Sequence, residues 1–503
     1  MGSNGCFFFL LIFLLSTFTC HGVEVSDVQI EVSSSAAKKI PETMFGGCFV
    51  EGELLRNAFR WKETIGPWEQ RPGHFGDVWH YWTDDGLGYY EFLQLAEDLG
   101  ATPIWVVNIG ISHHDKVNIT DIAPLVEDIL DSLEFAKGSA ESKWGSVRSS
   151  MGHPEPFLVK YVALGNEDCV FNFYREHYLK FHTAIREAYP DIQMISNCDG
   201  SRVQLDHPAD LYDFHVKLPT LSPVFGLSFL DRIILNVFVS EYAAVEEKPG
   251  DGGNGSLVAS LAEAAFLTGI EKNSDIVQMA SYAPLFVNDN DHTWMPDAIV
   301  FNSWQQYGTP SYWMQTFFRE SSGALIHPIT INSSYSQQLA ASAITWQDSK
   351  ISFLRVKIVN FGPVAVNLTI SVSGLEASVN SARSVVTVLT SSNPLMGTRS
   401  VNQRRGGELQ DASVIFEPAQ DGVHGRDCRN GQVLFIGGAN TPLPTGVLTT
   451  TAVRYIDNPA FLLLFVHDTL LAVAVDSTLV ADVLMLLLLL GYVSACGMQV
   501  GHA

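Results

Sequence analysis

The stretch that decides the fold covers residues 157–168, Phe-Leu-Val-Lys-Tyr-Val-Ala-Leu-Gly-Asn-Glu-Asp. It begins as an apolar run typical of a buried strand and ends abruptly in Gly165, Asn166 and Glu167. A second stretch, residues 236–242, Asn-Val-Phe-Val-Ser-Glu-Tyr, ends in the same way with Glu241. Because (β/α)₈ barrels present polar side chains at the carboxyl ends of their strands, the two stretches predict such a barrel.

The segments around these stretches alternate between strand and helix patterns. Between residues 45 and 318 this alternation is typical of a parallel α/β sheet. The clearest helical pattern has apolar side chains about 3.6 residues apart: Tyr174, Tyr178, Phe181 and Ile185. We therefore expect further strands at residues 103–108, 192–196 and 211–215, and helices at 84–100, from 174 to Pro190, and at 257–270.

Beyond about residue 319 the pattern becomes that of antiparallel strands. Residues 351–360, 363–373 and 385–389 are interpreted as strands. In the second of them, apolar residues alternate strictly with polar ones: Val366, Leu368, Ile370 and Val372 against Asn367, Thr369 and Ser371. The predicted fold class is therefore α/β, with a (β/α)₈ TIM barrel over residues 45–318 followed by a C-terminal β-sandwich over residues 319–420.

The two ends of the chain fit neither domain. Residues 23–44 alternate roughly and are interpreted as the remnant of an N-terminal β-region, with one or two edge strands. In the tail, residues 421–503, we expect a loop at 421–446, and residues 460–493 are apolar but interrupted by aspartates. Two interpretations of this tail stay open: a membrane tail or anchor signal, and a non-native end of the reading frame.

Residues 1–22 predict a secretory signal peptide, with an apolar core at residues 7–15. An uncleaved anchor is the alternative, but the apolar core is short for a bilayer. Secretion makes four Asn-X-Ser/Thr motifs candidate glycosylation sites: Asn118, Asn254, Asn332 and Asn367. The seven cysteines show no paired spacing, so we expect one or two disulfides at most.

Charge and motif content restrict the partners. The formal net charge of −24 disfavours nucleic acid and anionic membranes, because their phosphates would be repelled. A neutral substrate such as a sugar is compatible with this charge. His113 and His114 are adjacent and do not place two metal ligands on one face, and there is no glycine-rich phosphate loop. We therefore expect no metal and no other cofactor, and the sequence does not predict the oligomeric state.

Glu167 and Glu241 together suggest acid–base chemistry on an acetal. Acetal hydrolysis needs a group that protonates the leaving oxygen and an opposed base or nucleophile. Two carboxylates across a barrel mouth can fill both roles, although either glutamate can instead be a structural residue in a salt bridge. Further polar and aromatic residues are expected at the mouth or, for the aromatic ones, in the core: Asn108, Asn166, Asn197, Asp199, His215, Trp79, Trp82, Trp105 and Trp304.

Longer motifs carry a family resemblance. Residues 165–169, Gly-Asn-Glu-Asp-Cys, and residues 238–243, Phe-Val-Ser-Glu-Tyr-Ala, resemble plant α-L-arabinofuranosidases of glycoside hydrolase family fifty-one. The resemblance covers roughly residues 46–390 and includes motifs at residues 46–52, 60–67, 71–77, 82–88, 197–200, 279–288 and 301–304.

This resemblance implies a retaining glycosidase. By position, Glu167 would be the acid/base and Glu241 the nucleophile, with carboxyl groups about 5–5.5 Å apart. It also implies that Asn166, Trp79 and His215 line an arabinose pocket. The expected substrate is terminal α-L-arabinofuranose on cell-wall polysaccharides such as arabinoxylan or arabinan, and the expected location is the extracellular matrix or cell wall.

The chain departs from the family pattern at two internal positions. Residues 40–45 run directly into Gly46, Gly47 and Cys48, so most of the N-terminal module and the first barrel strand are expected to be missing. Lys217 stands where the family has a tyrosine, and the family pattern is lost until Phe238. Two alternative functions stay open: a β-xylosidase-type activity on the same carboxylates, and a catalytically inactive secreted protein that binds wall sugars.

Overall fold

The structure is a computed structural model that describes residues 25–34, 37–41, 45–46, 53–78, 80–200, 203–219, 236–245, 255–290, 298–302, 304–348, 351–362, 365–374, 385–390, 408–412, 422–424 and 432–440. Four predicted features lie outside the described residues: the signal peptide at 1–22, the apolar tail at 460–493, Trp79 and Asn254.

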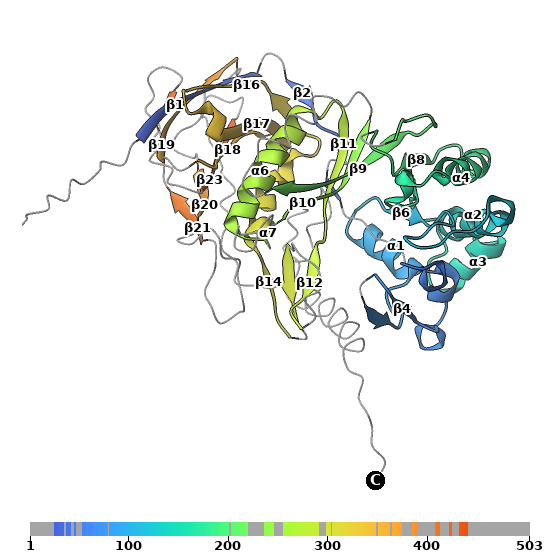
Figure 1. The fold of residues 1–503 in the computed structure, drawn as a ribbon. Helices are drawn as coiled ribbons and strands as arrows, with labels where there is room; N and C mark the ends of the chain where they lie inside the picture. The colour runs from blue at the N-terminus through green and yellow to red at the C-terminus, as the bar shows by residue number, and fades with distance from the viewer. Residues whose placement is uncertain are drawn as a thin grey trace, which may run out of the picture.

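Seven parallel strands form most of a barrel (Figure 1). They are β3 (Phe45–Gly46), β6 (Ile104–Val107), β7 (Tyr161–Leu164), β8 (Gln193–Ser196), β9 (Leu211–Pro219), β10 (Val237–Val245) and β11 (Val277–Tyr282). Their spatial order, β3-β11-β10-β9-β8-β7-β6, follows the chain from β6 to β11. This singly wound parallel order confirms the predicted barrel architecture, with one strand fewer than a closed barrel of eight.

The vacant place in this barrel lies between β3 and β6. β3 pairs in parallel with β11, with Phe45 opposite Ala280. In a singly wound barrel the neighbour of the last strand is the first strand. The expectation that the first strand is missing is therefore wrong: Phe45–Gly46 occupies the first place and the second is vacant. Among the described residues, no strand pairs with the outer edge of β3 or of β6.

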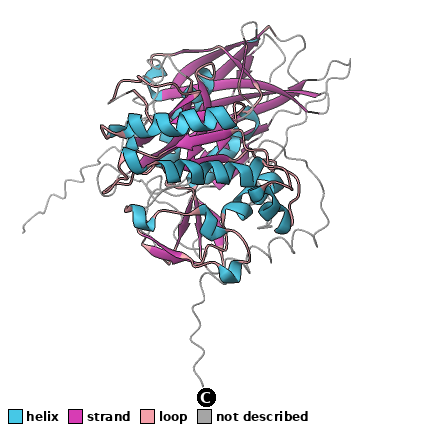
Figure 2. Ribbon diagram, turned by 90° about the vertical axis from the view of Figure 1, so that its right-hand side faces the viewer, coloured by secondary structure: helices cyan, strands magenta, loops and turns pink. Residues whose placement is uncertain are grey.

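Helices cover the outer face of the sheet, as Figure 2 shows with the barrel side toward the viewer. They are α1 (Tyr89–Asp98), α2 (Ala123–Lys137), α3 (Lys143–Ser150), α4 (Tyr174–Ala188), α6 (Leu257–Lys272) and α7 (Pro310–Gln315). The stripe predicted for α4 is confirmed, because all four of its members are buried. α1 begins later than predicted, because Asp85 has a left-handed φ of 57° and the Asp84 carboxylate accepts the Gly86 N–H, so these residues form a turn.

Short elements complete the fold. The 3₁₀ helices are η2 (Leu55–Asn57), η3 (Trp61–Thr64), η4 (Trp68–Gln70), η5 (Ile119–Asp121), η6 (Asp168–Val170), η7 (Thr316–Ser321) and η8 (Ser336–Gln338). Two small sheets pair β4 (His74–Gly76) with β5 (Tyr81–Thr83), and β12 (Phe286–Asn288) with β13 (Ile299–Phe301) and β14 (Gln306–Gly308).

The second domain contains two sheets, in the orders β16-β1-β19-β22 and β2-β15-β17-β18-β23-β20-β21. Their strands are β1 (Val25–Ser33), β2 (Lys38–Lys39), β15 (Leu325–His327), β16 (Ile329–Asn332), β17 (Leu339–Asp348), β18 (Ile351–Asn360), β19 (Ala365–Ser373), β20 (Val385–Thr390), β21 (Glu408–Ala412), β22 (Gly422–His424) and β23 (Gln432–Asn440). The strands predicted around 351–389 are confirmed.

Two expectations about this domain are wrong. β1 is not an edge strand, because it lies between β16 and β19 and supplies buried side chains to the sandwich core. Residues 421–446 are not only a loop, because β23 lies between β18 and β20. The glycines at 437 and 438 interrupt the apolar run of β23 and weaken its strand signal.

α6 connects the two domains. Nearly all of its residues are buried, and it packs between β10 of the barrel and β17 and β18 of the sandwich (Figure 1). A buried ion pair joins Glu271 of α6 to Lys357 of β18, and the Glu271 carboxylate also accepts from Ser321 and Ser342.

None of the helices in the described ranges is long and apolar enough to cross a bilayer.

Candidate active site

The chain leaves β7 through a tight left-handed turn that presents Glu167. Gly165 has a φ of 81° and Glu167 a φ of 56°, and η6 begins at the next residue. Gly165 is required at its position, because a Cβ there would collide with Asp168 Oδ2 and lie 2.7 Å from Asn197 Nδ2. The turn leaves the Glu167 side chain about half exposed, at 54% of its surface, whereas Asn166 is buried.

His215 connects Glu167 to the neighbouring strands. It lies on β9, and its Nδ1 is 2.9 Å from Glu167 Oε1. Its Nε2 is 3.1 Å from Oδ2 of Asp213, which lies two residues earlier on the same strand. Because side chains at i and i+2 share one face of a strand, Asp213 and His215 point to the same side of the sheet.

Glu241 lies within β10, after a shift in its register with β9. Its side chain is mostly buried and meets two cationic groups. Oε2 of Glu241 is 3.7 Å from His215 Nδ1 and 3.5 Å from Lys217 Nζ. Lys217 also donates to the carbonyl oxygen of Ala283, at 3.1 Å.

The two glutamates converge on His215: Glu167 follows the carboxyl end of β7, and His215 and Glu241 lie opposite each other in the middle of β9 and β10. One carboxylate oxygen of Glu167, one of Glu241 and one ring nitrogen of His215 all lie within 4.8 Å of one another. This separation is close to that of retaining glycosidases and shorter than the roughly 6.5–9.5 Å of inverting ones. The same three atoms are close enough to share a cation, although here the His215 ring contacts both carboxylates and Lys217 contacts that of Glu241.

The pKa values of His215 and Glu167 shift in opposite directions. Burial alone would lower the pKa of His215, but the charge of Asp213, hydrogen bonds to Asp213 and Glu167, and the charge of Glu241 raise it to about 11. The hydrogen bond from His215 lowers the pKa of Glu167 despite partial burial. The resting site therefore holds its proton on His215, with Glu167 as a carboxylate.

A disulfide and a buried acid support the Glu167 turn. Cys169 of η6 is bonded to Cys198, which follows β8. Burial raises the pKa of Asp168 to about 8, although its carboxylate accepts the Asn166 N–H at 3.2 Å. The expectation of few disulfides is compatible with this bridge, whose pairing was not predicted.

Several other residues named from the sequence have partners away from the two glutamates or are exposed. Asn108 follows β6, but its amide binds the backbone of Gly110 and Ile111. Trp105 packs against Tyr89 in the outer core of the barrel. His113 and His114 each contact the Glu53 carboxylate, at 3.1 Å. Trp82 and Trp304 are exposed, at 59% and 70%.

Sequence reasoning missed two residues that contact the catalytic candidates. Asp213 carries a detectable signal, since its spacing from His215 places both on one strand face. Lys217 was noticed only as a departure from a family pattern, and its contact with Glu241 depends on the register between β9 and β10.

Of the sequons, Asn118 and Asn332 are exposed, and Asn367 lies in β19 opposite Asp27.

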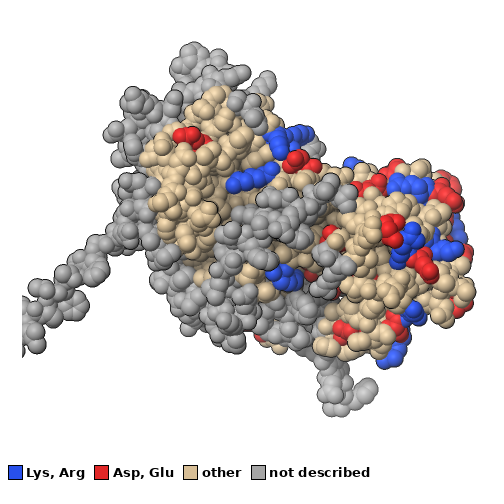
Figure 3. Space-filling view, turned by 45° about the horizontal axis from the view of Figure 1, so that its top comes forward, with Lys and Arg blue, Asp and Glu red and all other residues tan. Residues whose placement is uncertain are grey.

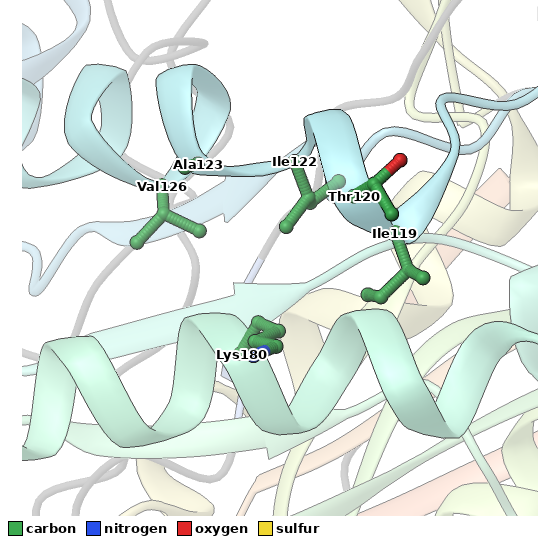
Figure 4. A pocket seen from close by; sticks show the side chains of 6 residues that line it. All are labelled: Ile119, Thr120, Ile122, Ala123, Val126 and Lys180. Atoms are coloured by element: carbon green, nitrogen blue, oxygen red, sulfur yellow. The ribbon is translucent and has the colours of Figure 1, made fainter.

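A separate hollow lies away from this site. A pocket of about 390 Å³ is lined by residues of the η5–α2 segment and α4, none of which is a candidate catalytic residue. Figure 4 shows these side chains. The lining residues are Ile119, Thr120, Ile122, Ala123, Val126 and Lys180. On the face shown in Figure 3, acidic and basic residues are interspersed over the α1–α4 side of the molecule.

An open barrel with two carboxylates this close, joined to a β-sandwich, has the architecture of a barrel glycoside hydrolase. Two family models match: "Alpha-L-arabinofuranosidase 1 domain" over residues 40–220 and "Alpha-L-arabinofuranosidase C-terminal domain" over residues 240–414. The chain belongs to the α-L-arabinofuranosidases of glycoside hydrolase family fifty-one.

The relatives include two proteins of Arabidopsis thaliana. Alpha-L-arabinofuranosidase 1 is 58% identical over 363 residues, which are 71% of this chain and 53% of the relative. Alpha-L-arabinofuranosidase 2 is 53% identical over 385 residues, 74% of this chain and 56% of the relative. The chain thus spans about half the length of these curated relatives.

Solved structures agree with the fold. An arabinose-bound α-L-arabinofuranosidase of family fifty-one superposes with a TM-score of 0.69 and 28% identity, covering 79% of this chain and 64% of that one. The Thermotoga maritima α-L-arabinofuranosidase in complex with arabinose has a TM-score of 0.63 and 18% identity, covering 82% of this chain and all of that one. The latter supports the fold alone.

Proposed function

We propose that this chain is a retaining glycoside hydrolase that releases terminal α-L-arabinofuranose. The observation that carries the proposal is the convergence of Glu167 and Glu241 on His215. One oxygen of each carboxylate and one ring nitrogen lie within 4.8 Å of one another. This spacing leaves room for direct attack on an anomeric carbon but not for an intervening water. The names of the curated relatives support arabinofuranose as the sugar.

In the proposed reaction, Glu167 is the acid/base and Glu241 the nucleophile. Glu167 takes up a proton from solvent and transfers it to the leaving glycosidic oxygen, while Glu241 attacks the anomeric carbon, breaks its bond to that oxygen and forms a glycosyl ester. Glu167, now a carboxylate, then removes a proton from water, which displaces Glu241 and releases the sugar. Since His215 holds Glu167 ionised at rest, entry of the substrate must break or weaken that hydrogen bond before the first step.

The substrate and location follow from the same reading. We propose that Asn166, Trp79 and His215 line the arabinose pocket, and that the polymer is a cell-wall polysaccharide such as arabinoxylan or arabinan. Secretion is supported by the signal pattern at residues 1–22 and by a Streptomyces chartreusis relative named "Extracellular exo-alpha-L-arabinofuranosidase", which is 32% identical. The exposed Asn118 and Asn332 are then glycosylation candidates, with Asn254 and Asn367.

One observation favours a second function. The Lys217 ammonium lies 3.5 Å from Glu241, where it competes with a sugar for the candidate nucleophile. A secreted protein that binds wall sugars without hydrolysing them would tolerate this contact.

The deciding experiment is hydrolysis of 4-nitrophenyl α-L-arabinofuranoside by the purified chain, with Glu167→Ala and Glu241→Ala as matched variants. Turnover in the parent that is lost in both variants supports the proposed enzyme. A folded parent that retains arabinan but releases no arabinose supports the binding protein. Preferred turnover of the aryl β-xyloside would instead indicate the β-xylosidase-type activity.

A further inference from the structure

A covalent bridge holds the turn that carries Glu167. Cys169 lies two residues after Glu167, and Cys198 lies two residues after the end of β8. The disulfide between them spans a sequence separation of 29 residues. Because β7 and β8 are neighbours in the sheet, the bridge ties the carboxyl ends of two adjacent barrel strands together.

The backbone of this turn is unfavourable by itself. A left-handed conformation costs a residue with a side chain about 1–2 kcal/mol, and Glu167 adopts it with a φ of 56°. Such conformations persist only where the surrounding structure determines them. Two hydrogen bonds contribute: the Asn166 N–H donates to the Asp168 carboxylate at 3.2 Å, and the Phe171 N–H to the Asp168 carbonyl at 2.9 Å.

Packing across the bridge also supports the turn. Asp168 precedes Cys169 and Asn197 precedes Cys198, and both side chains lie against the bare Cα of Gly165. Asp168 Oδ1 and Asn197 Oδ1 are buried with no hydrogen-bond partner among the described residues. Their other polar atoms do bond here: Asp168 Oδ2 accepts from the Asn166 N–H, and Asn197 Nδ2 donates to the Leu164 carbonyl of β7 at 3.5 Å, so both side chains fasten the turn beside the bridge.

We propose that the Cys169–Cys198 disulfide is a positioning element for Glu167. It keeps the left-handed turn in place, so that the Glu167 carboxylate stays at His215 and within reach of a sugar bound at Glu241. The proposal rests on the proposed function, since it takes Glu167 as the acid/base. Opening the bridge lets the turn relax and moves the carboxylate, while Glu241, which lies on β10, keeps its place.

Opening the bridge is expected to affect substrates with different leaving groups to different extents. A displacement of about 1 Å can cost about 100-fold in rate, and a general acid contributes about 10²–10⁴-fold. A substrate whose leaving group departs without protonation is affected less than one that needs the acid. Loss of the bridge therefore changes the dependence of the rate on the leaving group, which a general loss of stability does not change.

The test compares kcat/KM of the full chain and its Cys169→Ala/Cys198→Ala variant on two substrates. 4-Nitrophenyl α-L-arabinofuranoside has a good leaving group, and methyl α-L-arabinofuranoside has a poor one. We expect kcat/KM on the methyl glycoside to fall at least about tenfold more than on the nitrophenyl glycoside. Ile129→Val, a buried change in α2 outside the segment that the bridge closes, is the control and should leave the ratio unchanged.

Dithiothreitol provides a second measurement that does not depend on folding of the variant. It reduces the disulfide to two thiols and is itself oxidised to its cyclic disulfide. The ratio should shift in the treated parent but not in the treated double variant. An unchanged ratio in both the folded double variant and the reduced parent overturns the proposal. A folded parent that is inactive on both substrates overturns the proposed function itself, which is a different outcome.

Discussion

Lys217 and Glu241 form an ion pair at the candidate site, with Nζ 3.5 Å from Oε2. Lys217 lies on β9 beside β10, and its Nζ also donates to the Ala283 carbonyl at 3.1 Å. The same carboxylate oxygen lies 3.7 Å from the protonated ring of His215. Two cationic groups therefore face the candidate nucleophile, and a substrate must reach Glu241 in competition with them.

Removing the lysine charge tests this competition. We expect Lys217→Met to raise kcat/KM on the nitrophenyl arabinofuranoside about threefold to fivefold, because a partly exposed ion pair is worth up to about 1 kcal/mol. Lys217→Arg keeps the charge and is the matched control, with no increase expected. A fall in kcat/KM for Lys217→Met would show instead that the lysine supports the reaction.

The raised pKa of His215 makes a prediction about stability and pH. The folded-state pKa is about 11, above the unfolded value of about 6.5. Its contribution to the free energy of unfolding is therefore complete below about pH 6.5 and is lost as pH rises toward about 11. Asp213→Asn removes the neighbouring charge that raises this pKa, so the decline in stability between about pH 7 and 10 should be shallower.

Urea unfolding at these two pH values measures the effect. His215→Gln is the control, because it removes the titrating ring and should also give a shallow decline. Parallel declines in the parent and Asp213→Asn would contradict the assignment of the raised pKa to Asp213.

Substitution of two glycines with positive φ distinguishes the effect of backbone conformation on stability from the effect of the Glu167 turn on activity. Gly165→Ala places a methyl group against Asp168 and Asn197, whereas Gly152→Ala has Tyr90 as its nearest contact, at 3.7 Å. Gly152→Ala should destabilise the fold by about 1–2 kcal/mol because its φ disfavours a side chain, and Gly165→Ala by more, because its methyl group also collides with neighbouring side chains. Only Gly165→Ala should also lower kcat/KM, by about tenfold or more, because only it displaces the Glu167 turn. Equal activities of the two folded variants would contradict this role.

From the buried ion pair between α6 and β18, we expect that removing one partner lowers stability far more than replacing both. Glu271 and Lys357 are fully buried. Glu271→Ala should lower the free energy of unfolding by about 3–5 kcal/mol, because it leaves an unpaired buried ammonium. Replacing both partners, as in Glu271→Leu/Lys357→Met, should cost much less, because no unpaired charge remains. Denaturant unfolding of the single and double variants measures the difference, and equal losses would refute the pairing argument.

Local patterns predicted much of the barrel and the sandwich. The helical stripe of α4 and the alternation in β19 depend on residues close in sequence, and both were confirmed. The start of α1 was placed too early because Asp85, which precedes the helix, has a left-handed φ that the residue pattern does not reveal. β23 was missed because its glycines weaken the alternation, and its place depends on pairing with β18 and β20.

The sequence by itself determined most of the barrel strands and helices and the residue types of the candidate site, because strand and helix periods and strand-end carboxylates are properties of short stretches. The tertiary structure alone decided that β1 lies inside the sandwich, that Phe45–Gly46 fills the first barrel place, and that Cys169 bonds to Cys198. It also decided that Asp213 and Lys217 reach His215 and Glu241. These relations depend on which distant segments become neighbours and in what register, and no local period in the chain specifies that.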